Sequence, residues 1–129
     1  MRAMPRPTNA ELAILRVLWS SGPSTVRQVH EALVAGGRRA VGYTTALKLL
    51  QIMTDKRLVA CDTSARTHVF TARVSETATQ KRLMTELVDR AFGGSALRLV
   101  QQAVASKRVS VQELREIRRF LDERNGGKS

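Results

Sequence analysis

Three short amphipathic segments followed directly by two strand-like runs constrain the fold of this chain more than any other feature. The first segment begins at Thr8 and Glu11, a hydroxyl and a carboxylate at the spacing of a helix-capping box. Its apolar residues recur at helical spacing: Leu12, Leu15, Leu18 and Trp19. Because Ser20-Ser21-Gly22-Pro23 interrupts this pattern, we expect one helix that ends there.

Two further helices are expected before the strands. The sequence Pro23-Ser24-Thr25 opens the second helix, which Gly36 and Gly37 close after the apolar positions Val26, Val29 and Leu33. The third spans Gly42 to Lys56 and has the i, i+3, i+4, i+7 pattern of one buried face, at Ala46, Leu49, Leu50 and Met53.

The strand-like runs are residues 58–62 and 68–72, separated by the polar residues 63–67. Three helices followed by a hairpin form a winged helix-turn-helix, in which the hairpin packs beside the third helix. The sequence therefore predicts a mainly α fold with a small β-hairpin, and a DNA-binding domain over residues 1–74.

Residues 75–125 predict a helical dimerisation module, and residues 126–129 a disordered tail. The last helix of the dimerisation module opens with a second capping box, Ser110 to Glu113. Three helices of about 45 residues cannot close a large core, so we expect a second copy of the chain to cover them; folding back as a monomer is the alternative. The expected dimerisation residues are Leu83, Leu87, Leu97, Val100, Leu114, Ile117 and Leu121.

The charge of the chain favours a polyanionic partner. The sequence has 22 Lys and Arg against 11 Asp and Glu, a net charge of +11. Residues 1–75 hold 11 of these cations and 4 of the acids, so the expected DNA-binding part is the more basic. Double-stranded DNA is the expected partner, although a solvated face or an acidic membrane surface would use the same charge.

The outward face of the third helix supplies the candidate base-reading residues. If its apolar stripe points inward, five side chains point toward the DNA major groove: Thr44, Thr45, Leu47, Lys48 and Gln51. Arg66, at the tip of the expected wing, and Arg38 and Arg39, before the third helix, are expected to contact the DNA backbone. Solvated surface positions are the alternative interpretation.

Other classes of function find little support in the residues. One cysteine, Cys61, excludes an intramolecular disulfide and a Cys-rich zinc site, and His30 and His68 lack partners at metal-ligand spacing. We expect no metal, no cofactor and no enzymatic activity, because neither a phosphate-binding loop nor a nucleophile elbow is present. The absence of a signal peptide or membrane span predicts a cytoplasmic protein without a membrane partner.

Several motifs in this order resemble the penicillinase-repressor (BlaI/MecI) family. They are residues 10–19 (AELAILRVLW), 25–29 (TVRQV), 43–46 (YTTA), 56–59 (KRLV), Arg66 and 114–117 (LREI). The resemblance implies a homodimeric transcriptional repressor of β-lactam-resistance or related stress genes. It would bind a palindromic operator through the third helix and the wing.

The resemblance also implies a sensor protease that relieves repression by cleaving the C-terminal module. Val100-Gln101 stands where the Asn-Phe cleavage pair would fall, and the paired C-terminal cysteines of the copper-responsive branch are missing. Ile52 and Arg57 stand where many relatives have Arg and Gly, which indicates a different operator sequence. The alternatives to a repressor are a non-specific, nucleoid-like nucleic-acid-binding protein and an adaptor whose winged domain binds protein.

Overall fold

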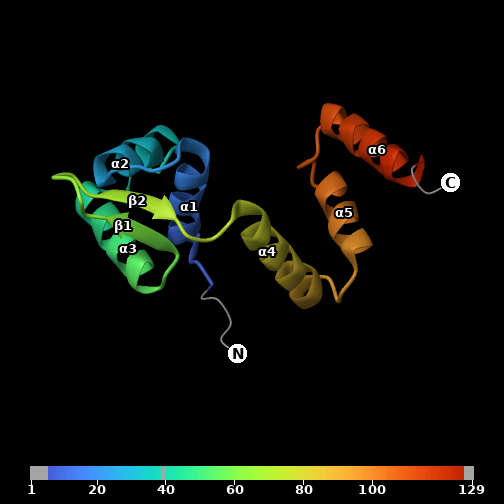
Figure 1. Cartoon of the computed structure of the whole chain (residues 1–129). Coiled ribbons are helices and arrows are strands. Elements are labelled where there is room, and N and C mark those ends of the chain that lie inside the picture. Colours follow the sequence, from blue (N-terminus) through green and yellow to red (C-terminus); the bar gives the residue numbers. More distant parts are fainter. Residues whose placement is uncertain (1–5, 39, 127–129) are drawn as a thin grey trace. The chain divides into compact units, whose positions relative to one another are not determined.

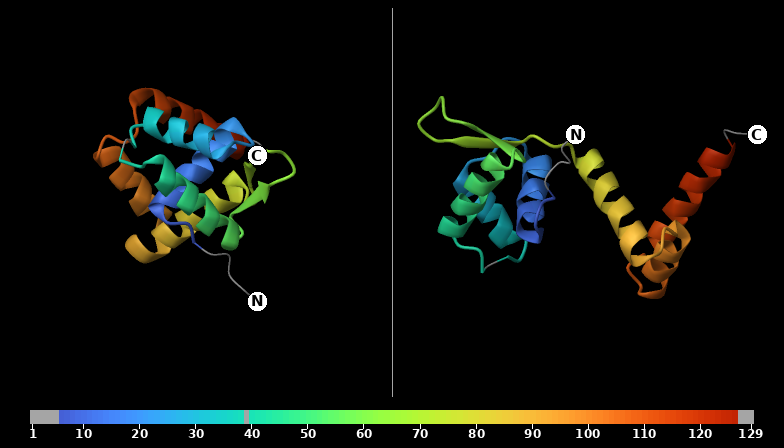
Figure 2. Two further views of the ribbon diagram at one scale, coloured as in Figure 1. Left: turned by 90° about the vertical axis from the view of Figure 1, so that its left-hand side faces the viewer. Right: turned by 90° about the horizontal axis from the view of Figure 1, so that it is seen from below.

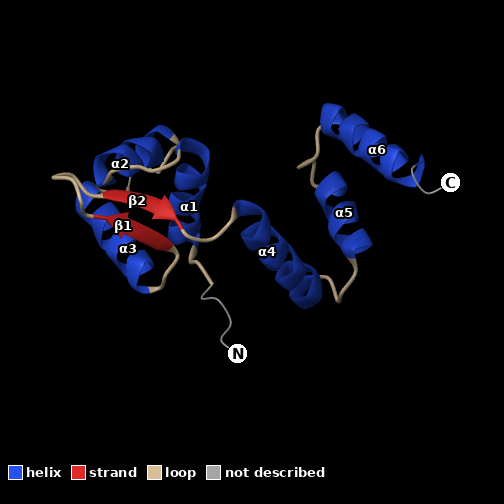
Figure 3. Ribbon diagram, in the orientation of Figure 1, coloured by secondary structure: helices blue, strands red, loops and turns tan. Residues whose placement is uncertain are grey.

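The computed structural model describes residues 6–38 and 40–126 and contains helices and one hairpin (Figures 1 and 3). The first elements are α1 (Asn9–Ser21), α2 (Val26–Ala35), α3 (Tyr43–Asp55), β1 (Val59–Asp62) and β2 (Val69–Ala72). They are followed by α4 (Glu76–Ala91), α5 (Ala96–Ala105) and α6 (Val111–Gly126). The predicted fold class, mainly α with a small hairpin in a winged-helix arrangement, is confirmed.

Capping boxes begin three of the helices. Before α1, the Thr8 hydroxyl accepts from the Glu11 amide at 3.2 Å, and the Glu11 carboxylate accepts from the Thr8 amide at 2.9 Å. The Ser110 and Glu113 pair caps α6 in the same way, as its spacing predicts. Thr25 and Gln28 form a third box before α2, whose Thr-x-x-Gln spacing is the same signal in the sequence.

The hairpin is antiparallel and pairs Val59 with Ala72 and Asp62 with Val69, one residue shorter per strand than predicted. Its turn projects away from helices α1, α2 and α3 (Figures 1 and 2). Ser24, between α1 and α2, forms an isolated bridge to Phe70, with N–H to O distances of 3.0 and 2.8 Å. This bridge attaches the hairpin to the turn between the first two helices.

One hydrophobic core joins the three helices and the hairpin. Its buried side chains are Ile14, Leu15, Leu18, Val26, Val29, Leu33, Ala46, Leu50, Met53, Leu58, Val59 and Phe70. Leu12, Trp19 and Leu49 are only half-buried, whereas Ile14, which the predicted stripe left out, is fully buried. The Trp19 indole N–H donates to the Val74 carbonyl at 2.9 Å and attaches the segment after β2 to α1.

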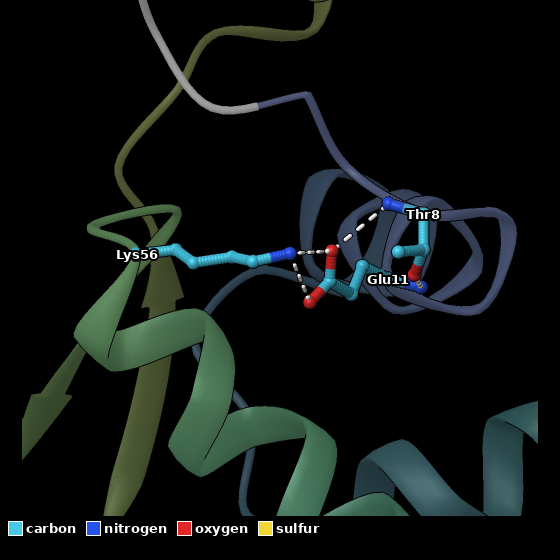
Figure 4. A network of polar contacts seen from close by, with 3 residues as sticks. All are labelled: Thr8, Glu11 and Lys56. Carbon is cyan, nitrogen blue, oxygen red and sulfur yellow. Dashed lines mark hydrogen bonds and ion pairs between the residues drawn. The ribbon is translucent and has the colours of Figure 1, made fainter.

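A partly buried ion pair joins Lys56 to the buried Glu11 (Figure 4). Glu11 is 1% exposed, and the Lys56 Nζ lies 2.9 and 3.0 Å from its two carboxylate oxygens. Burial by itself raises the pKa of Glu11, but the hydrogen bond from the Thr8 amide and the Lys56 ammonium outweigh it and lower the pKa below its ordinary value. The pair connects the start of α1 to the end of α3.

The contacts divide the chain into two compact units, Met1–Lys81 and Arg82–Ser129. Among the described residues of the second unit, Val88 alone is buried.

Gly126, the first residue of the predicted tail, still belongs to α6, and residues 127–129, the rest of that tail, lie outside the described residues. Within residues 6–38 and 40–126, no helix is both long and apolar enough to span a membrane.

Candidate nucleic-acid interface

Helix α3 has a buried face and an exposed face. Ala46, Leu50 and Met53 have no exposed surface and attach the helix to the core. Four of the five predicted base-reading residues are exposed on the other side: Thr44, Thr45, Lys48 and Gln51. Because the buried residues fix the rotation of the helix, these polar side chains are held in one orientation toward solvent.

Leu47 differs from its expected position. Instead of pointing freely into solvent, it is half-buried and packs against the edge of the core. Its partial burial explains why a leucine is tolerated on this face, since packing against the core removes part of its apolar surface from water.

The first turn of α3 lies beside helix α2. Gly42 precedes α3 without a side chain that could cap the first backbone N–H groups. Tyr43 is 49% exposed, and its ring packs edge-on against His30 of α2, with the ring centroids 6.1 Å apart. The amide end of a helix carries partial positive charge, so this end of α3 suits a negatively charged ligand such as a phosphate.

A groove of about 310 Å³ lies between α3 and the hairpin, and we call it the α3–wing groove. Its lining residues are Leu47, Gln51, Thr54, Asp55, Cys61, Thr63, His68 and Phe70. Two predicted base-reading residues, Leu47 and Gln51, therefore share one depression with side chains of the wing. The sequence did not predict this groove, because its two walls are separate along the chain.

The wing turn carries Arg66, which is exposed as predicted. At the start of this turn, the Asp62 carboxylate accepts a hydrogen bond from the Ser64 amide at 2.9 Å. This hydrogen bond lowers the pKa of Asp62 below its ordinary value. The Asp62 contact orders the base of the turn that presents Arg66 to solvent.

Of the two arginines expected to contact the DNA backbone before α3, the structure places only Arg38. Arg38 is exposed and lines a pocket of about 440 Å³ with Arg16 of α1 and Glu76 of α4. None of the four exposed polar residues of α3 lines this pocket, so Arg38 is not grouped with them. Arg39 lies outside the described residues.

The predicted dimerisation residues are largely uncovered within one chain. Six of them are 39 to 65% exposed, namely Leu87, Leu97, Val100, Leu114, Ile117 and Leu121, and Leu83 is half-buried. Leu114, Ile117 and Leu121 line a shallow groove of about 580 Å³ along α6. Large exposed apolar residues missing from the prediction are Met84, Val104, Val111 and Phe120.

Comparisons with known proteins agree with this architecture. The solution structure of the monomeric form of Bacillus licheniformis BlaI in complex with the blaP half-operator is similar to this chain, with a TM-score of 0.50 and 21% identity. The similarity covers 60% of this chain and 92% of that one. The solution structure of the DNA-binding domain of the repressor BlaI matches with the same values. At this identity, the two structures support the winged-helix fold.

Sequence comparisons extend over nearly the whole chain. The transcriptional regulators BlaI of two Mycobacterium tuberculosis strains are each 34% identical over 128 residues, which are 98% of this chain and 91% of each relative. The family model described as penicillinase repressor matches residues 7–123. The chain therefore belongs to the penicillinase repressor family of transcriptional regulators and has that family's winged-helix DNA-binding domain.

Proposed function

We propose that the chain is a homodimeric transcriptional repressor that binds a palindromic operator through α3 and the wing. The observation that carries this proposal is the exposed polar stripe of α3, opposite the fully buried Ala46, Leu50 and Met53. A helix enters the major groove and reads base edges with residues that are both exposed and held in place.

The chemistry of the stripe suits base readout. The Lys48 ammonium donates to guanine acceptors or to a phosphate, and the Gln51 amide pairs with the N6 and N7 edge of adenine. The methyl groups of Thr44 and Thr45 contact thymine methyl groups, while their hydroxyls donate or accept hydrogen bonds. The half-buried Leu47 completes this set as an apolar contact at the edge of the stripe.

Arginine contacts to the DNA backbone fix the register of the complex. Arg66 extends from the wing turn, and Arg38 and Arg39 stand in the link before α3. Each phosphate contact releases condensed counterions, so each one adds about 0.9 to the steepness of the salt dependence of binding. The charge of +7 within residues 1–75 supports this electrostatic contribution.

A second copy of the chain is the proposed cover for the C-terminal apolar residues. Burying a single leucine or isoleucine contributes about 1.5–3 kcal/mol, and six of the candidate side chains are exposed in one protomer. Association about a twofold axis would bury the same residues on both protomers. It would also present two α3 helices to half-sites spaced by about one DNA turn or a multiple of it, which is why we propose a palindromic operator.

Genes of β-lactam resistance or of a related stress response are the proposed targets, because the family is that of the penicillinase repressor. A sensor protease pathway is the proposed upstream partner. Val100 lies within α5, and Val100-Gln101 replaces the expected Asn-Phe cleavage pair. We therefore infer that the inducing signal acts on this protein without that cut.

Selection of bound fragments from random and genomic DNA by the purified full chain tests the proposed function. The selected sequence and scrambled DNA are then titrated at one fixed salt concentration. We expect a palindrome bound with a Kd of about 10⁻⁸ M or lower and at least about a thousandfold preference over scrambled DNA. Uniform binding would instead assign the chain to the non-specific class.

A pair of matched variants tests the role of α3 in the same titration. Lys48→Ala removes one cation from the proposed reading face, whereas Lys81→Ala removes one exposed cation outside α3 and the wing. Loss of a base contact costs about 1–3 kcal/mol, so Lys48→Ala should weaken operator binding by about fivefold or more and lower the preference for the operator. Equal effects of the two variants would contradict base reading by α3.

A further inference from the structure

The one carboxylate that lines the α3–wing groove lies on its α3 side. Thr63 and His68, which have hydrogen-bond donors, lie on the wing side, and the Asp55 carboxylate lies on the α3 side. All three side chains are exposed. Within the described residues, none of the three has a hydrogen bond or an ion pair. They are therefore available to a ligand that enters the groove.

Two further polar residues line the groove on the α3 side, Thr54 and Gln51, and the proposed function already assigns Gln51 to base contacts. The Thr54 hydroxyl donates to the Leu50 carbonyl at 2.8 Å and is already used within α3. Leu47, Cys61 and Phe70 form an apolar floor, in which Phe70 is 3% exposed. The groove thus combines an apolar floor with the donors of Thr63 and His68 on the wing side, and it has its one lining carboxylate, Asp55, beside the Gln51 amide on the α3 side.

We propose that this groove binds the sugar-phosphate backbone of one DNA strand, with Thr63 and His68 donating hydrogen bonds to a single phosphate and Asp55 excluding phosphates from the α3 rim. The inference rests on the proposed function, because a strand reaches the groove when α3 lies in the major groove. The apolar floor matches the C–H surface of deoxyribose, and the donors match phosphate oxygens.

Charge complementarity supports DNA as the occupant. Arg66 lies in the same wing turn as Thr63, and Lys48 lies about one helical turn before the groove residue Gln51 on the exposed side of α3. The part of the chain that contains the groove is strongly basic. The exposed Asp62 immediately precedes Thr63 but does not line the groove. Asp55 is the one carboxylate among the lining residues, and its repulsion of phosphate gives it a distinct role in specificity.

Asp55 contributes to specificity because its negative charge disfavours complexes in which a phosphate lies at the α3 side of the groove. In the operator complex, base contacts hold the strand against the wing rim, away from the carboxylate. On scrambled DNA, no base contacts select that register, so phosphates also approach Asp55 and are repelled. Discrimination that works by weakening the competing complex is a general route to specificity.

The donors on the wing rim are tested by variants that keep side-chain shape. Thr63→Val and His68→Phe remove the donors, and Thr67→Val is the control because Thr67 is exposed in the same turn but does not line the groove. Each donor variant should weaken binding to operator and scrambled DNA alike, by about threefold to tenfold, since a phosphate contact carries no sequence information. Effects no larger than that of Thr67→Val overturn this part of the proposal.

A second test neutralises single phosphates of the operator and measures the affinity for each, which a merely structural role of Thr63 and His68 would not change. Single neutral methylphosphonate groups are placed at each phosphate of the selected operator. For the wild-type chain, one position in each half-site should show a loss of affinity that disappears in the Thr63→Val/His68→Phe double variant. If the double variant keeps the wild-type pattern, the two residues do not contact a phosphate.

Asp55→Asn tests the opposite rim, with Glu31→Gln as the control that removes an exposed negative charge of α2 outside the groove. Asp55→Asn should strengthen binding to scrambled DNA by about threefold to tenfold and to the operator by less, so the preference for the operator falls. Equal changes in Asp55→Asn and Glu31→Gln refute the role of Asp55. If the wild-type chain shows no operator preference, the proposed function fails, while the donor variants still test phosphate binding on scrambled DNA.

Discussion

Replacing Lys56 with methionine should lower the free energy of unfolding by about 2–3 kcal/mol at neutral pH, because it leaves the buried Glu11 carboxylate without its cation. Breaking a fully buried pair costs about 3–5 kcal/mol, and the lower value applies here because the Lys56 side chain is 32% exposed. The Thr8 amide still donates to Glu11 and retains part of its stabilisation.

The loss should depend on pH in a defined direction. The pKa of Glu11 lies below its ordinary value of 4.5 in the folded chain, despite the opposing effect of burial. Its stabilisation is therefore complete above the unfolded-state pKa and is lost as the pH falls through the folded-state pKa. The difference between wild type and Lys56→Met should accordingly shrink as the pH falls toward the lowered folded-state pKa of Glu11 in the wild type, since a protonated Glu11 no longer needs the Lys56 cation.

Urea unfolding followed by the fluorescence of Trp19, the one tryptophan of the sequence, measures this change at a fixed protomer concentration. Glu11→Gln and the double variant complete a cycle that isolates the interaction between the two side chains. A destabilisation below about 0.5 kcal/mol, or one that is the same at pH 4 and pH 7, would refute the reasoning.

Three other positions give separate tests of the fold, the dimer and the wing. Arg57 has a φ of 65°, a left-handed backbone conformation that is strained for a residue with a Cβ atom and unstrained for glycine. Arg57→Gly should therefore raise the free energy of unfolding by about 0.5–1 kcal/mol in the same urea assay, and a decrease would contradict this strain. Ile117→Glu should abolish dimerisation in sedimentation experiments, because it places an unpaired charge in the proposed interface, whereas Gln112→Glu on another face of α6 should leave the dimer intact. Arg66→Ala should reduce the slope of log K against log salt by about 0.9, and an unchanged slope would exclude a phosphate contact from the wing tip.

Local patterns predicted most of the elements and the exposed polar face of α3. Capping boxes at Thr8 and Ser110 marked helix starts correctly because their hydrogen bonds span three residues. The apolar period of α3 identified its buried face, and the exposed polar residues of the interface follow from the same geometry. Such features depend on neighbours within one turn, so periodicity and spacing are sufficient to find them.

Other features required the tertiary structure. Glu11 has the sequence context of an exposed capping residue, but it is buried because α3 brings Lys56 to it from 45 positions away. Leu47 is half-buried because of the core beside it, and Arg38 lines a pocket with α1. The Ser24 bridge to Phe70 likewise joins segments with no shared pattern.

The sequence by itself determined where the helices and the hairpin lie, which face of each helix is apolar, and the family to which the chain belongs. Only the tertiary structure decided which polar groups face each other across the α3–wing groove and which carboxylate is buried. The physical reason is the range of the interactions: hydrogen bonds and periodicity within a helix act between near neighbours in the chain. Burial and ion pairing depend on residues that meet only when separate elements pack.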